Sequence, residues 1–396
     1  MSQMLEEDFT EEGGELNLQH DELQEHNNND TIIKQLSPSS EYIDLNTSTL
    51  KPLHRYLLIG FVTFLVLIFF GSLMGVIIKN RKKLRQSGLT FPQPTYTPSD
   101  DKLHFLVIGD FGRENDAQRK VANSMGEYCK ENDGCDFVVG VGDNIYQSGV
   151  ESIYDEQFKT KFEDIYNHKA LEDLDFYMIL GNHDYRNDVK AQILYTQLSK
   201  RWKMLDFFYE INKKSRLGGF DLNLLFTDTN PFHFLFFLDP LTNKTVINEQ
   251  AKRIPEQMEW LKSKLRKPKG DDQWTIVAGH SPVYSASQHY DSQPLIQNFE
   301  PLFREYRVPL YLCGHDHQLG WMANREIINS REQTQYIISG AAGGSIYRTI
   351  KYNPNLFNYY VGEGGFYSVE VQHDFIFVIA LNENGEEIYK FRIDKQ

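Results

Sequence analysis

The sequence predicts an α/β fold for residues 101–396, and three observations lead to this prediction. Short apolar runs rich in Val, Ile, Phe and Tyr recur along this part of the chain, which favours buried strands. Segments with a helical apolar period separate these runs, as is typical of α/β domains. The closing stretch, 365–393, alternates apolar and polar residues around a turn at Asn382–Gly385, so we expect it to form antiparallel strands that finish a sheet.

The expected strands share one feature, because most of them lead through a glycine into Asp, Asn or His. Open α/β sheets place their sites at the carboxyl ends of strands, so these polar residues are candidates for chemistry. The apolar runs are 103–110, 136–143, 176–184, 274–280, 308–317 and 335–344. Between them, helices are expected over 116–130, 255–266 and 295–306.

Three different segments precede this domain. Residues 1–50 carry twelve Asp and Glu against one Lys and have no apolar period, so we expect a disordered acidic tail. Residues 56–78 contain no charge over 23 positions and predict one transmembrane helix, with basic flanks inside 51–85. Residues 86–100 are rich in Pro, Ser and Thr and predict a semi-stiff linker.

The polar residues at the strand ends form a mixed set of possible metal ligands. Carboxylate, phenolate and amide oxygens together with imidazole nitrogens suit Fe, Mn or Zn better than Ca or Mg. One ordinary site cannot use them all, whereas two metals bridged by a carboxylate can. Taken alone, an aspartate at a strand end is explained as well by capping the next helix, and a single histidine by an ordinary structural role. The set is Asp110, Asp143, Tyr146, Asn182, His183, His280, His315 and His317.

The histidine pair of "GHDH" carries a geometric expectation. If His315 and His317 lie on an extended backbone, their side chains point the same way, since strand side chains repeat every second residue. Each imidazole could then serve a different metal ion.

Five motifs in order, "GDFG", "GDNIY", "GNHD", "AGHSPVYS" and "GHDH", resemble those of the calcineurin-like metallophosphoesterases. Within that superfamily the sequence is similar to the purple acid phosphatases of the tartrate-resistant type, over about residues 103–393. The resemblance implies a four-layer α-β-β-α sandwich with two packed mixed sheets and a binuclear metal centre at the strand ends. General members of the superfamily begin with Asp-x-His, whereas here Gly112 stands in the histidine's place and Tyr146 supplies the missing ligand.

The resemblance also implies a role for each ligand. One Fe(III) ion would be bound by Asp110, Tyr146 and His317. A divalent ion, Fe, Zn or Mn, would be bound by Asn182, His280 and His315, and Asp143 would bridge the two metals. His183 and His289 match the two histidines that bind phosphate and protonate the leaving group.

The implied activity is that of an acid phosphatase, which hydrolyses phosphomonoesters by attack of a metal-bound hydroxide. A phosphodiesterase or phosphoprotein phosphatase on the same site remains an alternative, and a non-enzymatic iron-binding protein is a third. Residues 238–256 do not match the protease-sensitive loop of mammalian members, so no proteolytic activation is expected. "FTDTNPF" at 226–232 resembles a structural strand of the family. The net charge of −10 over residues 86–396 disfavours a nucleic-acid partner.

Two observations on membrane orientation conflict. Two Lys or Arg precede the apolar segment within fifteen residues and five follow it, which on charge alone places the domain in the cytosol. A ferric acid phosphatase belongs instead in an acidic lumen or outside the cell, where Cys129 and Cys135 could form a disulfide and leave Cys313 as a free thiol.

Further sequence signals favour a cytosolic N-terminus and a lumenal or extracellular catalytic domain in a lysosomal, endosomal or cell-surface glycoprotein. The sequon Asn243–Thr245 is a glycosylation acceptor if the domain is lumenal. The pattern Tyr42–Leu45 in the tail resembles signals that sorting adaptors read from the cytosol.

Overall fold

A computed structural model of the chain describes residues 96–395, except for 234–235, 237, 267–269, 271, 288, 325–333, 344 and 348–355. These residues belong to a compact unit that begins at Phe91. The acidic tail, the apolar segment 56–78 and residues 86–95 of the expected linker lie outside the described residues. Within the described part, no helix combines the length and apolarity needed to cross a bilayer.

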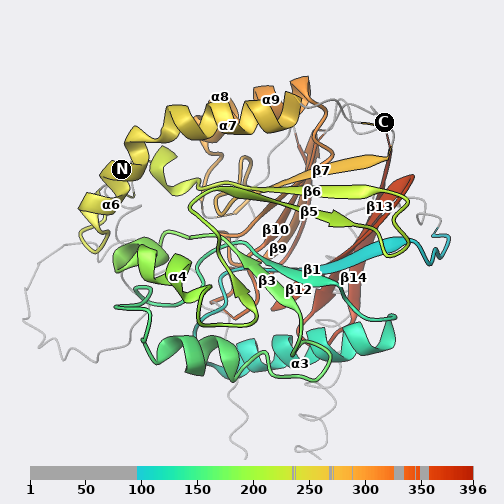
Figure 1. The fold of residues 1–396 in the computed structure, drawn as a ribbon, viewed down its shortest axis with the longest axis horizontal. Coiled ribbons are helices and arrows are strands. Elements are labelled where there is room, and N and C mark those ends of the chain that lie inside the picture. Colours follow the sequence, from blue (N-terminus) through green and yellow to red (C-terminus); the bar gives the residue numbers. More distant parts are fainter. Residues whose placement is uncertain are drawn as a thin grey trace, which may run out of the picture. The chain divides into compact units, whose positions relative to one another are not determined.

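Two seven-stranded mixed sheets form the centre of the domain (Figure 1). The first has the order β14-β13-β12-β1-β2-β3-β4, and the second has the order β11-β9-β10-β8-β7-β6-β5. The strands of the first sheet are β1 (Lys102–Ile108), β2 (Phe137–Gly140), β3 (Asp175–Met178), β4 (Trp202–Lys203), β12 (Gly365–Gln372), β13 (Phe375–Asn382) and β14 (Glu387–Asp394). Those of the second are β5 (Tyr209–Lys214), β6 (Asp221–Phe226), β7 (Gln273–Ala278), β8 (Leu310–Cys313), β9 (Leu319–Asn324), β10 (Gln335–Ser339) and β11 (Leu356–Val361).

Helices cover the outer face of each sheet, which completes the four expected layers (Figure 1). The first sheet is covered by α3 (Asp116–Glu131) and α4 (Val189–Tyr195). On the side of the second sheet lie α7 (Ile254–Arg266), α8 (Gln293–Asn298) and α9 (Glu300–Glu305), while α6 (Lys244–Lys252) leads into α7. Short helical turns occur at η2 (Lys159–Glu163), η3 (Asp184–Arg186) and η4 (Asn230–Phe232).

The alternation of side chains along β1 shows why the layers form. Phe105 and Val107 belong to the apolar cluster between the two sheets. Leu106 and Ile108 point the other way, into the cluster that packs against α3. A strand whose two faces are both apolar must be covered on both sides, so β1 lies at the centre of its sheet.

One helix expected from the sequence is two helices in the structure. The apolar period over 295–306 continues across Phe299, but α8 ends at Asn298 and α9 begins at Glu300. Pro301 lies in the first turn of α9 and has no N–H to continue the hydrogen bonds of α8. The proline therefore divides the segment, and the side-chain period alone could not show it.

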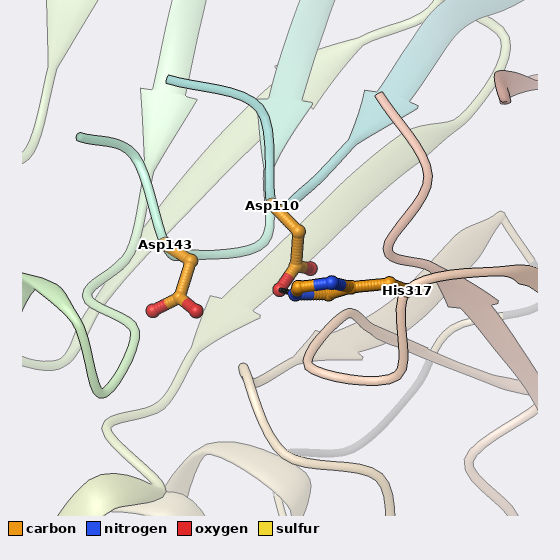
Figure 2. A group of neighbouring side chains, drawn as sticks. All are labelled: Asp110, Asp143 and His317. Atoms are coloured by element: carbon orange, nitrogen blue, oxygen red, sulfur yellow. Dashed lines mark ion pairs between the residues drawn. The ribbon is translucent and has the colours of Figure 1, made fainter. Parts of the chain in front are cut away.

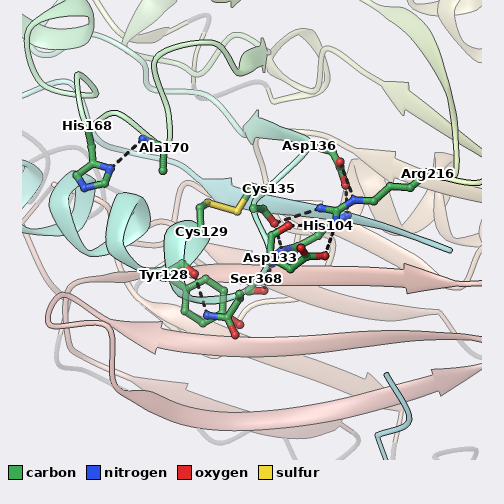
Figure 3. The surroundings of a disulfide bond; sticks show 12 residues. His104, Tyr128, Cys129, Asp133, Cys135, Asp136, His168, Ala170, Arg216 and Ser368 are labelled. Carbon is green, nitrogen blue, oxygen red and sulfur yellow. Dashed lines mark hydrogen bonds and ion pairs between the residues drawn. A yellow bond between two sulfur atoms is a disulfide. The ribbon is translucent and has the colours of Figure 1, made fainter. Parts of the chain in front are cut away.

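A disulfide closes the loop between α3 and β2 (Figure 3). Cys129 in the last turns of α3 is bonded to Cys135, just before β2, as the sequence allowed, and Cys313 is buried with a free thiol. The Arg216 side chain holds the same loop through Asp133 at 2.6 Å and Asp136 at 3.1 Å. This loop lies at the amino end of β2, away from the candidate metal ligands that follow its carboxyl end.

Candidate metal centre

Two neighbouring strands deliver the first two carboxylates of the site. β1 and β2 pair in parallel, so their carboxyl ends meet at one edge, where Asp110 and Asp143 follow them. The two turns are joined, because the Asp110 N–H donates to the Gly142 carbonyl oxygen at 3.0 Å. Both aspartates take left-handed backbone conformations, with φ of 57° and 50°. Such conformations are uncommon for residues with a side chain and cluster at functional sites.

Two further buried side chains, Tyr146 and His317, converge on these carboxylates. Figure 2 shows Asp110, Asp143 and His317, whose ligand atoms lie within 4.8 Å of one another. The phenolic oxygen of Tyr146 lies 3.1 Å from Asp110 Oδ1 and 2.9 Å from Asp143 Oδ2. The same oxygen lies 3.1 Å from His317 Nε2. One phenolic proton cannot serve three neighbours at once, so the donor set fits a bound cation.

A second group of ligand atoms forms around His280. The Nδ1–H of His280 donates to the Val141 carbonyl oxygen at 2.9 Å, which turns Nε2 toward the site. That nitrogen lies 3.1 Å from Asn182 Oδ1 and 3.5 Å from Asp143 Oδ1. A ring nitrogen fixed by a backbone carbonyl is the usual arrangement behind a metal-ligating histidine. The His315 ring completes the group, with its centroid 5.1 Å from that of His280.

Asp143 belongs to both groups through different oxygens. Oδ2 accepts from Tyr146, while Oδ1 faces His280 and accepts from the His183 N–H at 2.9 Å. Burial works against ionisation of Asp143, but His280 and His183 outweigh it and lower its pKa to about 2. An ionised carboxylate with one oxygen toward each group has the geometry that a bridging ligand needs.

The "GHDH" segment has a different conformation from the one expected. β8 ends at Cys313, and His315 takes a left-handed φ of 68°, so the two histidines do not lie on an extended strand. The prediction that both point the same way is wrong, since the Asp316 N–H closes a tight turn onto Gly314. His317 instead contacts Tyr146, and His315 contacts His280.

His183 and His289, the two outer histidines that are not proposed as ligands, each lie beside a different group of ligand atoms. The His183 ring is 4.5 Å from that of Tyr146, and its Nδ1 lies 2.7 Å from both the Gln147 carbonyl oxygen and Arg186 Nη1. The His289 ring is 4.0 Å from that of His315. Burial and His289 hold the pKa of His315 well below its usual value, so its imidazole is neutral, which is the form that ligates. The structure thus brings together all nine residues that the sequence singled out.

The sequence profile of the calcineurin-like phosphoesterases matches residues 103–319. The human tartrate-resistant acid phosphatase type 5 is 30% identical over 318 residues, which cover 74% of this chain and 91% of the relative. Purple acid phosphatase 4 of Arabidopsis thaliana is 32% identical over 305 residues, covering 75% and 85%. The chain belongs to the calcineurin-like phosphoesterases, and within them to the purple acid phosphatases.

A solved structure described as a membrane-complex anchor shares the fold. GAP50, the anchor in the inner membrane complex of Plasmodium, superposes with a TM-score of 0.63 at 23% identity, covering 75% of this chain and 90% of its own. That likeness shows the shared fold alone. The sequence relatives are named acid phosphatases, which places the present chain among the phosphoric monoester hydrolases.

Position 112 shows why this purple acid phosphatase has no Asp-x-His motif. A Cβ atom added to Gly112 would lie 1.8 Å from the carbonyl oxygen of Asn144. No side chain fits there while the loop that carries Tyr146 takes its present path. The glycine at position 112 is therefore required by the loop conformation that places Tyr146 in the site.

Two buried acids support the site and were not assigned from the sequence. Asp184, the last residue of "GNHD", accepts from the backbone N–H groups of Asn144 and Gly181, at 3.1 and 2.8 Å. Asp316, inside "GHDH", accepts from the Ser285 hydroxyl at 2.7 Å. Burial raises the pKa of each carboxyl to about 7. Their only sequence signal is their place inside motifs whose neighbours are ligands, so a supporting role could not be told from ligation.

Proposed function

We propose that this chain is a membrane-anchored acid phosphatase that hydrolyses phosphomonoesters at a binuclear Fe(III)–M(II) centre. One observation carries the proposal: the phenolic oxygen of Tyr146 lies among Asp110, Asp143 and His317. A phenolate is a hard anionic donor and favours Fe(III) over a divalent ion. Iron at this position would give the protein a visible absorption band.

The two groups of ligand atoms support two metal positions. Asp110, Tyr146 and His317 would hold the ferric ion. Asn182, His280 and His315 would hold a divalent ion, Fe, Zn or Mn, since amide oxygen with imidazole nitrogen accepts all three. Asp143 would bridge the two, with one oxygen already facing each group.

The chain's own residues then set the course of the reaction. Two ions bound here would polarise the phosphate and activate water. His183 and His289 stand at opposite groups of the site, each positioned to contact a phosphate oxygen or to donate a proton to the departing alcohol. Holding substrate and proton donor in place supplies part of the rate enhancement.

The alternatives differ in what they require of these residues. A non-enzymatic iron-binding protein has no need of the outer histidines, yet both lie beside ligand rings in this chain. A phosphodiesterase or phosphoprotein phosphatase would use the same centre. Comparing kcat/KM for a monoester, a diester and a phosphopeptide distinguishes these enzymes, and the proposal requires the monoester to rank first.

A spectrum tests the metal assignment directly. The full chain is purified in detergent, loaded with iron, oxidised and assayed on a chromogenic monoester from pH 4 to 8, with and without tartrate. We expect a visible band that Tyr146→Phe abolishes and that Tyr154→Phe, at a tyrosine 80% exposed, leaves unchanged. A colourless iron-loaded wild-type protein would remove the ferric assignment.

We also propose that residues 56–78 anchor the enzyme with a cytosolic tail and a lumenal or extracellular catalytic domain. The Cys129–Cys135 disulfide supports this orientation, because disulfides persist in oxidising compartments. A tail that starts in the cytosol would also present Tyr42–Leu45 to sorting adaptors. The positive charges after the apolar segment oppose this orientation.

The sequon offers a test of orientation, and the structure improves its design. Asn243 caps α6, where its Oδ1 accepts from the Val246 N–H at 3.3 Å, so replacing it also removes a cap worth about 1 kcal/mol. Thr245 is exposed, and Thr245→Ala removes the sequon without touching the cap. A lumenal domain predicts a mobility shift on endoglycosidase treatment that this variant lacks. Protease added on the cytosolic side should also leave a lumenal domain intact. If the wild-type protein shows no mobility shift and this protease digests its catalytic domain, the orientation is contradicted.

A further inference from the structure

Arg113 follows Gly112 directly and lies on the face of the candidate ferric ligand. Its guanidinium carbon is 4.1 Å from the centroid of the Tyr146 ring. The backbone N–H of Arg113 donates to the Gln118 side-chain oxygen at 3.2 Å, and Gln118 is fully buried in α3. The loop that presents the guanidinium is therefore anchored to the helix layer.

The Arg113 guanidinium has no ion-pair partner among the residues that the structure describes. Across the part of the chain that the structure describes, Arg113 forms no ion pair within 4.0 Å, and its buried Nε has no hydrogen-bond partner. A guanidinium in this position acts on the aromatic ring below it, because the ring face carries partial negative charge. The ring on which it lies is that of Tyr146.

Lys161 is a second cation near Tyr146, but it contacts the backbone and not the ring. Lys161 donates to the backbone carbonyl of Tyr146 and to the Gln157 side-chain oxygen at 2.7 Å, so it stabilises the loop. The Asp110 and Asp143 carboxylates lie beside the phenolic oxygen of Tyr146, at 3.1 and 2.9 Å, while the Arg113 guanidinium lies over the ring. Arg113 is therefore the cation that opposes the carboxylates at the phenol.

We propose that Arg113 is a positioning residue that acts through Tyr146 and weakens the donation of electrons from the phenolate to the ferric ion. The inference rests on the proposed function, since it requires a ferric ion at Tyr146. A cation stacked on the ring lowers the energy of the phenolate electrons that are donated to the iron. It lowers the energy of the iron orbitals less, because the iron lies farther away, beyond the phenolic oxygen. The absorption band then lies at shorter wavelength, and the ferric ion is left a stronger Lewis acid.

The test compares Arg113→Gln and Arg113→Lys with the wild-type full chain, iron-loaded and oxidised. We expect the visible band to move to longer wavelength in Arg113→Gln. In Arg113→Lys it should move less, because lysine keeps the charge and loses the planar stack. Arg119→Gln is the matched control, an exposed arginine on α3 that pairs with Glu114 at 4.0 Å, and it should not move the band.

Kinetics and metal content separate this role from others. We expect Arg113→Gln to lower kcat with KM nearly unchanged, at the iron content and thermal stability of the wild-type protein. An unmoved band at full iron content overturns the inference, and a raised KM with an unmoved band assigns Arg113 to substrate binding instead. A wild-type protein with no band overturns the proposed function and this inference together, whereas a band that fails to shift overturns this inference alone.

Discussion

The backbone N–H of Tyr146 donates to the carbonyl oxygen of Gly112 at 2.9 Å, so the loops after β1 and β2 are held backbone to backbone. In the same loop, the backbone of Asn144 and Ile145 leaves no room for a Cβ atom at position 112. The loop that carries one carboxylate is thereby fixed against the loop that carries the other carboxylate and the phenol.

We expect Gly112→Ala to lower the free energy of unfolding by about 3 kcal/mol or more, because the methyl group meets backbone atoms that cannot rotate away. Gly112→His should do the same and should not restore an Asp-x-His site. Gly270→Ala is the control, since the nearest atom there is 4.0 Å from the added Cβ. Denaturant unfolding and iron content measure the effect, and a stable, iron-binding Gly112→His protein would contradict it.

The outer histidines should affect turnover without affecting colour. Replacing His183 and His289 by alanine removes two groups beside the ligand rings and none of the proposed ligands. We expect the visible band to persist and kcat to fall by roughly 10²–10⁴-fold, the usual contribution of general acid–base catalysis. The control is His373→Ala, at an exposed histidine in the turn between β12 and β13.

The leaving group distinguishes proton donation from phosphate binding. A nitrophenolate leaves without a proton, whereas an alkoxide needs one. If the histidines donate the proton, the double variant should lose more activity on an alkyl phosphate than on nitrophenyl phosphate. Equal losses on both substrates would assign the histidines to phosphate binding alone.

Strand positions and their polar ends could be predicted from the sequence because both follow from local patterns. β1 is apolar on both faces, and the residues after it leave the sheet at the edge where parallel strands end. Asp110 and Asp143 had to be neighbours once β1 and β2 were parallel. The parallel order of the strands therefore predicts that the ligands meet at this edge of the sheet.

The details inside the loops could not be predicted, because tertiary contacts determine them. His315 turns left-handed where the backbone follows Cys313 out of the sheet, and no spacing rule shows that. The hydrogen bonds of Asp184 come from residues that are distant in sequence until the fold forms. Arg113 is read as an ordinary surface arginine until its contact with the Tyr146 ring is known.

A buried tyrosine should stabilise the loop after β6. The Tyr185 hydroxyl donates to Asp228 Oδ2, and both groups are buried, with Asp228 in the "FTDTNPF" stretch expected to be structural. Burial raises the pKa of Asp228 to about 6. Tyr185→Phe leaves that carboxyl oxygen without its donor and should cost about 1–3 kcal/mol of stability. Thermal unfolding measures it against Tyr154→Phe, and equal melting temperatures would refute the role.

His104 should make the domain less stable in acid. Its Nδ1–H donates to the Gly134 carbonyl oxygen at 2.8 Å and its Nε2 accepts from the Ser368 hydroxyl at 2.9 Å, so the folded state holds the ring neutral. Burial lowers its pKa below the ordinary value. Above about pH 6.5 both folded and unfolded states are neutral and His104 contributes no pH dependence.

Below about pH 6.5 the unfolded state binds a proton that the folded state refuses. The free energy of unfolding should therefore decrease as the pH is lowered, by at most about 1.4 kcal/mol per pH unit for this residue. His104→Gln, which can keep one donor and one acceptor, should flatten this slope in denaturant unfolding between pH 7 and 5. His373 provides a test of sign: hydrogen bonds to Asp272 and Asp374 raise its pKa, so it stabilises the fold as the pH falls toward about 6.5. His373→Gln should remove that gain above about pH 6.5 and leave the slope below it unchanged. A slope unchanged by His104→Gln would show that the folded state protonates this histidine as readily as the unfolded chain does.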